Sequence, residues 1–282
     1  MPQPLKAMIL AAGFGTRLRP ITNALPKPLV PISGIPLIYV TIKRLALMQV
    51  DEIFVNGHYL WEKLKAALET IPFPHPPITF SRETPEILGT AGGIGAIREF
   101  LNGEDLLVLS SDIITDFDIE GLIDCHKRSK AFATMGLLKP RRQGKTPVWC
   151  LEDKIIGFGE DIGSLACGEP GSFSVIQMLS NEFIKEIPER EYSEIIPFYK
   201  RFLSEGKTIK AFFTDPLWYD IGEPAQLQKA NQHIRQLLES GKLPPQIPIV
   251  EILSDLPKWK AEEVTKQPAY TTDHDDQEIS ST

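Results

Sequence analysis

The sequence has few cysteines and no long hydrophobic run, and both absences restrict the classes of protein it can belong to. Its 282 residues include three cysteines and no Cys-x-x-Cys pair, which argues against a disulfide framework and against a zinc knuckle. No apolar stretch approaches the ~18 residues of a membrane-spanning helix. The opening segment MPQPLKAMILAAG leads into a glycine turn and does not resemble a secretory signal. We therefore expect a reduced, cytoplasmic protein without a membrane partner.

Runs of basic residues are also missing. The sequence contains 30 Lys and Arg residues and 37 Asp and Glu residues, which gives a net charge of -7. The final 22 residues hold six acidic residues and one lysine, so the rest of the chain is close to neutral. A near-neutral body without a Lys/Arg cluster argues against a nucleic-acid partner.

Hydrophobic patterns alternate between strand and helix along the chain. Residues 6–12 form an apolar run without alternation, as in a strand buried on both faces of a parallel sheet. Further strands are predicted at residues 51–56, 78–81 and 105–110, with helices at 36–48, 61–71, 93–100 and 119–129. Later strands are predicted at 131–138, 147–151, 154–158, 171–179 and 208–214, with helices at 194–204 and 224–239. This order predicts a three-layer α/β/α fold around a doubly wound, mixed but mainly parallel sheet of the Rossmann-like type.

The composition changes near the C-terminus. Residues 1–240 form one predicted domain with two halves, 1–130 and 131–240. Residues 241–282 are first rich in proline and then acidic and polar, and we expect the last part to be disordered. A short apolar patch at 247–253 could dock on the body.

The first strand ends in a glycine-rich turn, Gly13–Thr16 (GFGT). Consecutive backbone N–H groups in such a turn form a nest for phosphate oxygens, and glycines permit the positive φ that a nest requires. The turn is not a Walker loop, because no Gly-Lys-Ser/Thr follows, and Leu18 occupies the third glycine position of a GxGxxG motif. Arg17 and Lys27 add two cations, and prolines flank the lysine. Two positioned cations beside a nest are typical of a polyphosphate site.

The segment Gly13–Ile38, GFGTRLRPITNALPKPLVPISGIPLI, resembles the N-terminal motif of sugar-1-phosphate nucleotidyltransferases. The resemblance extends from about residue 6 to residue 234. Within the family, Val55–Leu68 and Leu88–Ile94 are most similar to N-acetylmuramate-1-phosphate uridylyltransferase and to short mannose-1-phosphate guanylyltransferase-like enzymes.

This resemblance implies a fold, an activity and a cofactor. The fold is the Rossmann-like nucleotidyltransferase fold, with residues 1–130 as the nucleotide-binding half and 131–240 as the sugar-binding half. The activity is transfer of a nucleotidyl group from an NTP to a sugar 1-phosphate, giving an NDP-sugar and pyrophosphate with Mg²⁺. The sequence leaves the base, the sugar and the oligomeric state open.

The resemblance also implies the roles of individual residues. Arg17 and Lys27 are the expected catalytic cations, and Asp112 and Asp220 the expected Mg²⁺ ligands. Leu88–Gly93 is the expected base-reading segment, although a glycine-rich helix N-terminus has the same composition. The residues expected to bind the nucleotide are Leu10, Ala11, Ala12, Gly13, Phe14, Gly15, Thr16, Glu83, Gly89 and Thr90. No histidine has metal or triad spacing, and none is needed, because a sugar 1-phosphate is already an ionised nucleophile.

The sugar-binding half departs from the family pattern. Ser110 and Ser111 precede Asp112, where relatives have Asn-Gly or Gly-Gly. Relatives hold the sugar phosphate with a lysine in a segment that here reads Phe158–Asp161 (FGED), without lysine. Ser174-Val175-Ile176 replaces Thr/Ser-Gly-Ile, which puts a branched side chain where a close sugar approach favours glycine. The expected sugar-phosphate residues are Ser110, Glu160 and Ser174, and the alternative cations are Lys139, Arg141, Arg142 and Lys145.

Two other functions stay open at this point. The altered sugar-binding half is compatible with a nucleotide-sugar-binding regulatory subunit that has lost turnover. A cytidylyltransferase acting on a non-sugar phosphate such as phosphocholine is the other possibility, and an aromatic cage for the ammonium group would distinguish it.

Overall fold

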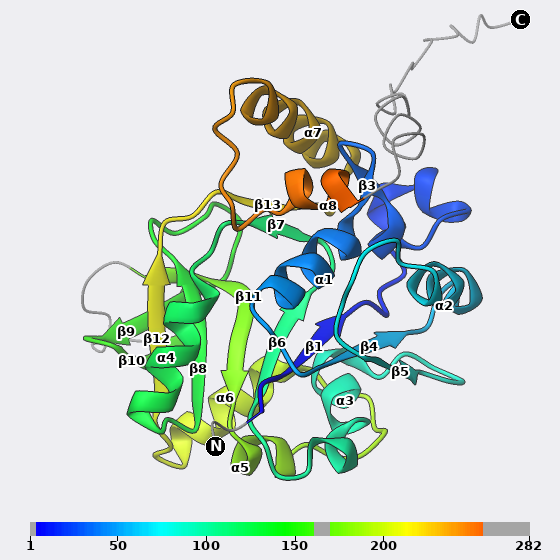
Figure 1. Cartoon of the computed structure of the whole chain (residues 1–282). Helices are drawn as coiled ribbons and strands as arrows, with labels where there is room; N and C mark the ends of the chain where they lie inside the picture. The colour runs from blue at the N-terminus through cyan, green and yellow to red at the C-terminus, as the bar shows by residue number, and fades with distance from the viewer. Residues whose placement is uncertain (1–3, 161–169, 256–282) are drawn as a thin grey trace, which may run out of the picture.

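A computed structural model describes residues 4–160 and 170–255. These residues fold around one nine-stranded sheet that has helices on both faces, which gives the three layers predicted from the sequence (Figure 1). The strand order is β5-β4-β1-β6-β11-β8-β12-β10-β9. The strands of this sheet are β1 (Lys6–Leu10), β4 (Glu52–Gly57), β5 (Ile78–Arg82), β6 (Leu106–Ser110), β8 (Ala133–Leu138), β9 (Pro147–Leu151), β10 (Lys154–Phe158), β11 (Gly171–Leu179) and β12 (Ile209–Thr214).

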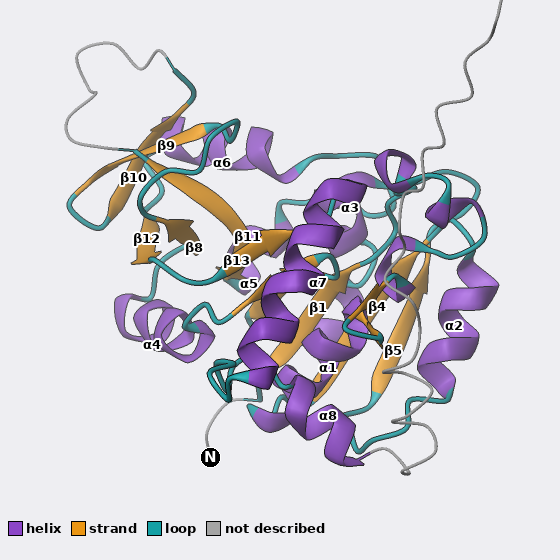
Figure 2. Cartoon of the chain, turned by 90° about the horizontal axis from the view of Figure 1, so that it is seen from above, coloured by secondary structure: helices purple, strands orange, loops and turns teal. Residues whose placement is uncertain are grey.

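The sheet is parallel at one end and mixed at the other. Strands β5, β4, β1 and β6 are parallel to one another, whereas β11 lies antiparallel between β6 and β8. Strand β12 is parallel to β8, and β10 and β9 complete the sheet as antiparallel strands. Seen from above, β9, β10 and β12 lie at the opposite end of the sheet from β4 and β5 (Figure 2).

Alternate side chains of the buried strands pack into two separate cores. On β1, Ala7 and Ile9 belong to the core under α1, α2, α4, α7 and α8, whereas Met8 belongs to the core under α3, α5 and α6. Burial on both faces explains why β1 is apolar throughout. The helices are α1 (Leu37–Leu47), α2 (Trp61–Glu69), α3 (Gly89–Gly95), α4 (Ile119–Ser129), α5 (Asn181–Lys185), α6 (Ile195–Ser204), α7 (Pro224–Glu239) and α8 (Ile249–Asp255).

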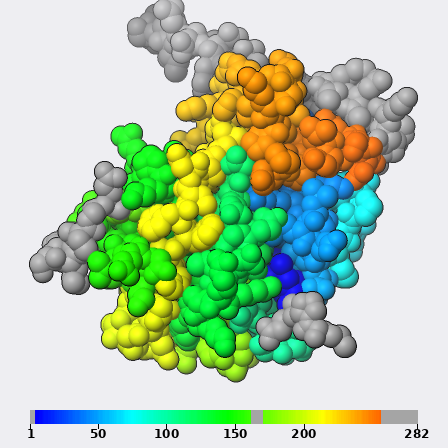
Figure 3. Space-filling model, turned by 60° about the vertical axis from the view of Figure 1, so that its left-hand side comes forward, coloured from blue at the N-terminus to red at the C-terminus, as the bar shows by residue number. Residues whose placement is uncertain are grey.

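The C-terminal helices cover the N-terminal third of the chain. Ile249 and Ile252 of α8 are buried in the same core as α1, and Lys43 of α1 forms an ion pair with Asp255. In Figure 3, α7 and α8 (orange) lie against the N-terminal residues (blue). The apolar patch at residues 247–253 therefore packs on the body, while the acidic segment expected to be disordered lies outside the described residues.

Several short elements were not predicted. The region after β1 contains the 3-10 helices η1 (Thr16–Leu18), η2 (Ile21–Asn23) and η3 (Lys27–Leu29), and then the small hairpin β2 (Pro31–Ile32) and β3 (Ile35–Pro36). A second small sheet pairs β7 (Ile113–Thr115) with β13 (Trp218–Asp220). Elements of two to three residues have no hydrophobic period for a sequence pattern to detect.

The helix predicted at residues 93–100 is displaced. Helix α3 begins already at Gly89, and a 3-10 helix, η4 (Arg98–Leu101), follows it. Glycine has a low helix propensity, so the pattern does not indicate the first turn. The backbone N–H groups of Ala91 and Gly92 both donate to the carbonyl of Ser193, which holds that turn in place.

Candidate nucleotide site

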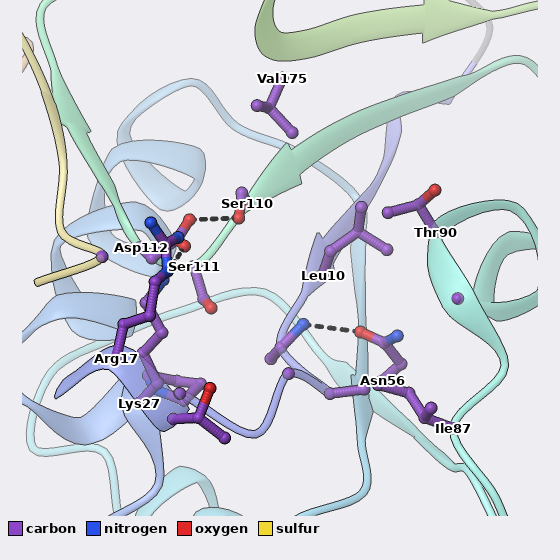
Figure 4. Close-up of a pocket in the computed structure, with 18 of the residues that line it drawn as sticks. Leu10, Arg17, Lys27, Asn56, Ile87, Thr90, Ser110, Ser111, Asp112 and Val175 are labelled. Atoms are coloured by element: carbon purple, nitrogen blue, oxygen red, sulfur yellow. Dashed lines mark hydrogen bonds and ion pairs between the residues drawn. The ribbon is translucent and has the colours of Figure 1, made fainter. Parts of the chain in front are cut away.

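A pocket of about 320 Å³ lies at the carboxyl ends of β1 and β6 (Figure 4). Ligands of open α/β sheets bind at this edge of the sheet. The backbone N–H of Ser111 donates to the Leu10 carbonyl at 3.0 Å, so the two strand ends are held together. Residues from both halves of the chain line the pocket: Leu10, Ala11, Ala12, Gly13, Gly15, Thr16, Arg17, Lys27, Pro28, Asn56, Ile87, Gly89, Thr90, Ser110, Ser111, Asp112, Val175, Glu194 and Gly222.

The glycine-rich turn forms one wall of this pocket. Gly15 has a φ of +64°, and a Cβ there would lie 3.0 Å from Thr22 Cγ2 and 3.1 Å from Lys27 Cβ. Both conformation and space therefore favour glycine at residue 15. The Thr22 hydroxyl donates to the Gly15 carbonyl at 2.7 Å, which fixes the turn. Phe14 does not line the pocket, and its ring is exposed and packs edge-on against His58.

Lys27 and Asp112, which both line the pocket, form an ion pair. The Ser110 hydroxyl donates to the other carboxylate oxygen of Asp112 (Figure 4). Both charged side chains are largely buried, with 14% and 19% of their surface exposed. Arg17, in contrast, is exposed and pairs with Glu223 at 3.2 Å. The two predicted cations thus both reach the pocket, one held deep inside and one at the rim.

Backbone hydrogen bonding between β13 and the segment at Asp112 brings Asp220 close to Asp112. Asp220 ends β13, where it pairs with Ile113 of β7, and the next N–H, from Ile221, donates to the Asp112 carbonyl at 2.9 Å. The Asp220 carboxylate accepts from Lys145 Nζ at 2.6 Å. Lys145 also lies over the Trp218 ring, 5.2 Å from its centroid. Of the four basic residues considered for the missing lysine, Lys145 is the one that contacts a predicted metal ligand.

The two aspartates form a plausible donor set for a magnesium ion only together with other ligands. Within residues 4–160 and 170–255 no group of three His, Cys, Asp or Glu side chains could hold a metal by itself. Mg²⁺ typically binds one or two carboxylates and completes its shell with water and substrate phosphate oxygens. Asp112 lines the pocket and Asp220 does not, but each aspartate pairs with a lysine ammonium, so positive charge is accommodated beside both carboxylates. The residues present therefore fit Mg²⁺.

A buried polar network, not predicted from the sequence, supports the backbone just before the glycine-rich turn. Asn56, at the end of β4, accepts from the Ala11 N–H at 2.7 Å and donates to Glu83 at 2.7 Å. The other Glu83 oxygen accepts from the Leu88 N–H at 2.7 Å. Glu83 is 2% exposed and does not line the pocket, and burial raises the pKa of its carboxyl group above the ordinary 4.5. Glu83 thus holds the loop before α3 directly at Leu88 and links it through Asn56 to Ala11. An asparagine at the end of a buried strand, Asn56, was the available signal.

The glycines of α3 serve close packing. A Cβ on Gly92 would lie 2.2 Å from the Glu191 carbonyl oxygen, and one on Gly95 would lie 2.2 Å from that of Pro188. The same segment accepts hydrogen bonds from the first turn of the helix, because the Ser193 carbonyl accepts from the N–H groups of Ala91 and Gly92. Gly89 and Thr90 remain on the pocket wall, and the Thr90 hydroxyl donates to Glu194 at 2.6 Å. The base-reading prediction therefore narrows to these two residues of the segment.

Two predicted sugar-phosphate residues lie away from the pocket. Glu160 is exposed and pairs with Arg141 at 3.1 Å, and Asp161 lies outside the described residues. Ser174 is fully buried, and its hydroxyl donates to the Gly136 carbonyl at 2.8 Å. Ser110 does line the pocket, and so does Val175, which was noted in the sequence only as a departure.

Asp118 caps a helix, as its position before α4 predicts. Its carboxylate accepts from the Gly121 N–H at 2.9 Å, and the residue is exposed. None of the described helices is long and apolar enough to cross a membrane.

Comparison with known proteins places these observations in a family. Residues 6–145 match the family model described as nucleotidyl transferase. Mannose-1-phosphate guanylyltransferase 1 of Arabidopsis thaliana is 32% identical over 228 residues, which cover 78% of this chain and 62% of the relative. The mannose-1-phosphate guanyltransferase of Yarrowia lipolytica is 38% identical over 236 residues, covering 78% and 61%. The chain thus spans about three fifths of the length of these relatives.

Solved structures share the fold at lower identity. A Bacillus anthracis structure named as a glucose-1-phosphate thymidylyltransferase has a TM-score of 0.69 at 22% identity, covering 82% of this chain and 95% of that one. A UDP-glucose pyrophosphorylase of Acinetobacter baumanii has a TM-score of 0.66 at 18% identity, covering 89% and 99%. With the sequence match and the pocket at the carboxyl ends of β1 and β6, the chain belongs to the nucleotidyl transferase family.

Proposed function

We propose that the protein transfers a nucleotidyl group from an NTP to a sugar 1-phosphate, releasing pyrophosphate. The observation that carries the proposal is the joint wall of the pocket: a glycine turn, a buried lysine and an aspartate from three separate segments. Its family membership and the names of its relatives support the same reaction. GTP with mannose 1-phosphate is the first pair to test, because the relatives at 32% and 38% identity carry that name.

In this proposal the protein binds, orients and neutralises, and it needs no general base. None of the histidines within the described ranges lines the pocket. The nucleophile, a sugar 1-phosphate, is already ionised at neutral pH, so alignment and charge neutralisation suffice. The turn at Gly13–Thr16 binds the triphosphate, with Lys27 inside the pocket and Arg17 at the rim as the neutralising cations.

Asp112 and Asp220 would hold Mg²⁺, which supplies charge neutralisation to the phosphate oxygens when bound. Lys27 and Lys145 must then leave the carboxylates they pair with in this structure. Both ammonium groups are on flexible stems and lie beside the aspartates, so each can turn to a phosphate oxygen. We assign Lys27 to the nucleotide and Lys145 to the sugar phosphate, since Lys145 comes from the loop between β8 and β9 in the second half of the chain.

Two observations favour the regulatory-subunit alternative. Val175 of β11 lines the pocket where relatives have glycine, and Phe158–Glu160 contains no lysine, so a nucleotide sugar could bind there without being made. A phosphocholine-type acceptor has less support, because no aromatic side chain of the described residues lines the pocket.

A pyrophosphate-release assay on the full chain tests the proposal. It crosses GTP, UTP, dTTP and CTP with mannose, glucose and N-acetylmuramate 1-phosphates in the presence of Mg²⁺, and repeats each active pair with excess EDTA. Release with one pair, abolished by EDTA, is the expected result. Silence with every pair, while calorimetry detects nucleotide binding, would favour the regulatory subunit instead.

A further inference from the structure

The strand β11 contains a valine in a backbone conformation that valine avoids. Val175 has a φ of +67°, in the left-handed region. This region is uncommon for any residue other than glycine, and a β-branched residue there is an outlier. Such conformations persist where the surrounding structure imposes them, and they cluster at functional sites.

The surroundings of Val175 do impose it. The pairing of β11 with β8 shifts register between Phe173 and Gln177, so Val175 lies in a bulge. The Ser174 hydroxyl donates to the Gly136 carbonyl at 2.8 Å and accepts from the Ile176 N–H at 3.2 Å, which ties both sides of the bulge. A Cβ on Gly136 would lie 2.7 Å from Ser174 Oγ, so glycine on β8 is needed for this contact.

The bulge places the Val175 side chain in the pocket. Val175 is half-buried and lines the cavity together with Ser110 and Asp112. In Figure 4 it lies beyond Ser110, at the opposite end of the pocket from Lys27 and the glycine turn. A group attached to the far side of a phosphate held near Asp112 would meet it first.

Accordingly, we propose that Val175 is a specificity-determining residue of the acceptor end, which excludes acceptors whose ring substituents need the space of its isopropyl group. The inference rests on the proposed function, because it assigns the β11 end to the sugar. A hydrophobic wall also rejects a hydroxyl group pointed at it, since that hydroxyl loses water and gains no partner. The acceptor is therefore a sugar phosphate whose face toward β11 is small and apolar.

The test compares binding of nucleoside diphosphates with binding of their sugar conjugates by calorimetry. First, GDP, UDP, dTDP and CDP are titrated into the full wild-type chain. The tightest of them is then compared with its mannose, glucose and N-acetylglucosamine conjugates, and the ratio of the two Kd values measures the contribution of each sugar. The same ratios are measured for Val175→Gly, Val175→Ala and the isosteric Val175→Thr.

The expected result is a change confined to the sugar. In Val175→Gly at least one bulky sugar conjugate binds about 10-fold more tightly relative to the diphosphate. This factor is in the range that a few methyl groups in a pocket control. Val175→Thr keeps the volume and leaves the exclusion of bulky sugars in place. Ile87→Ala, at the nucleotide end, weakens the diphosphate and its conjugates equally. Val175→Ala gives a second cavity variant should the glycine variant melt early.

Two outcomes would overturn the inference, and they differ. If the diphosphate binds normally and every sugar ratio is unchanged in Val175→Gly and Val175→Ala, Val175 does not select the acceptor and the proposed function stands. If neither the diphosphates nor any of their sugar conjugates bind the wild-type chain, the proposed function fails, because the conjugates are its products, and the inference fails with it.

Discussion

Two residues of the pocket share one backbone conformation but differ in side chain: one is glycine and the other is the β-branched valine. Gly15, in the turn after β1, has a φ of +64°, and Val175, in the bulge of β11, has a φ of +67°. At the first position the residue type matches the conformation, and at the second it opposes it. Gly15, at the proposed nucleotide end, thus carries no such strain, while Val175, at the proposed acceptor end, keeps a strained side chain.

The supports of the two ends differ in the same way. The glycine-rich turn is anchored at Ala11, just before it, by the buried side chains of Asn56 and Glu83. The acceptor end relies on charged side chains from a loop, with Lys145 paired to Asp220 and 37% of the lysine exposed. Rigid backbone contacts suit a triphosphate common to many reactions, whereas exchangeable side chains suit a variable sugar. The following changes test this division, from the largest expected effect to the smallest.

Removing the carboxylate of Asp112 or of Asp220 should nearly abolish turnover, whichever substrate is varied. Asp112→Asn and Asp220→Asn are each expected to lower kcat/KM by about 10³-fold, because the carboxylates neutralise Mg²⁺ and position it against the phosphates. Pyrophosphate release measured across a Mg²⁺ titration gives the comparison. Asp118→Asn is the matched control, since Asp118 caps α4 and should leave activity unchanged. Full activity in Asp112→Asn would remove the basis for the proposed metal site.

Removing Lys145 should affect only the acceptor end. Lys145→Ala is expected to raise KM for the sugar 1-phosphate about 10- to 100-fold, because a charge-assisted contact to phosphate is lost. KM for the NTP should change by less than about 3-fold if the two ends are independent. Lys139→Ala is the control from the same loop, as Lys139 lies over Phe213 and not at Asp220. An equal rise in both KM values would show that Lys145 does not discriminate between the substrates.

Glu83 tests the support of the nucleotide end. In Glu83→Gln one amide donor faces a donor from Asn56 or Leu88, so the free energy of unfolding is expected to fall by about 1–3 kcal/mol. Burial raises the pKa of Glu83, so the folded state binds its proton more tightly than the unfolded chain does. The resulting stabilisation is present below pH 4.5 and is lost as the pH rises through the raised pKa.

The deficit of Glu83→Gln relative to wild type should therefore be largest at low pH and shrink as the pH rises. Urea unfolding from pH 4 to pH 7 measures it. Glu86→Gln, an exposed residue of the same loop, should show neither the deficit nor its pH dependence. A deficit that grows with pH would mean that the ionised form of Glu83 is the stabilised one.

The sequence predicted the nucleotide end better than the acceptor end, for a physical reason. Buried strands, glycine turns and amphipathic helices follow from local pattern, so β1, the turn at Gly13–Thr16 and the helix at 119–129 were all found. Contacts between distant segments do not leave a local pattern. The ion pair of Asp220 with Lys145 depends on the three-residue strands β7 and β13. The hydrogen bond between Asn56 and Glu83 depends on the pairing of β4 with β5. The same limit applies to Glu160, which resemblance placed near the sugar and the structure places on an exposed loop.

The smallest expected effect is the change in the free energy of unfolding in Val175→Gly. The sign of this change tests whether Val175 is strained. A valine-to-glycine change in a strand usually destabilises through lost packing and added chain entropy, and Val108→Gly in buried β6 should cost at least about 3 kcal/mol. At Val175 the left-handed conformation costs valine about 1–2 kcal/mol, which glycine does not incur. That relief offsets the entropy of ~0.5–1 kcal/mol and the loss of a half-buried side chain. Val175→Gly is therefore expected to leave the free energy of unfolding unchanged or to raise it by up to ~1 kcal/mol in urea titrations. A loss as large as that of Val108→Gly would mean that the isopropyl group is there for packing, and the contrast between the two ends of the pocket would lose its energetic basis.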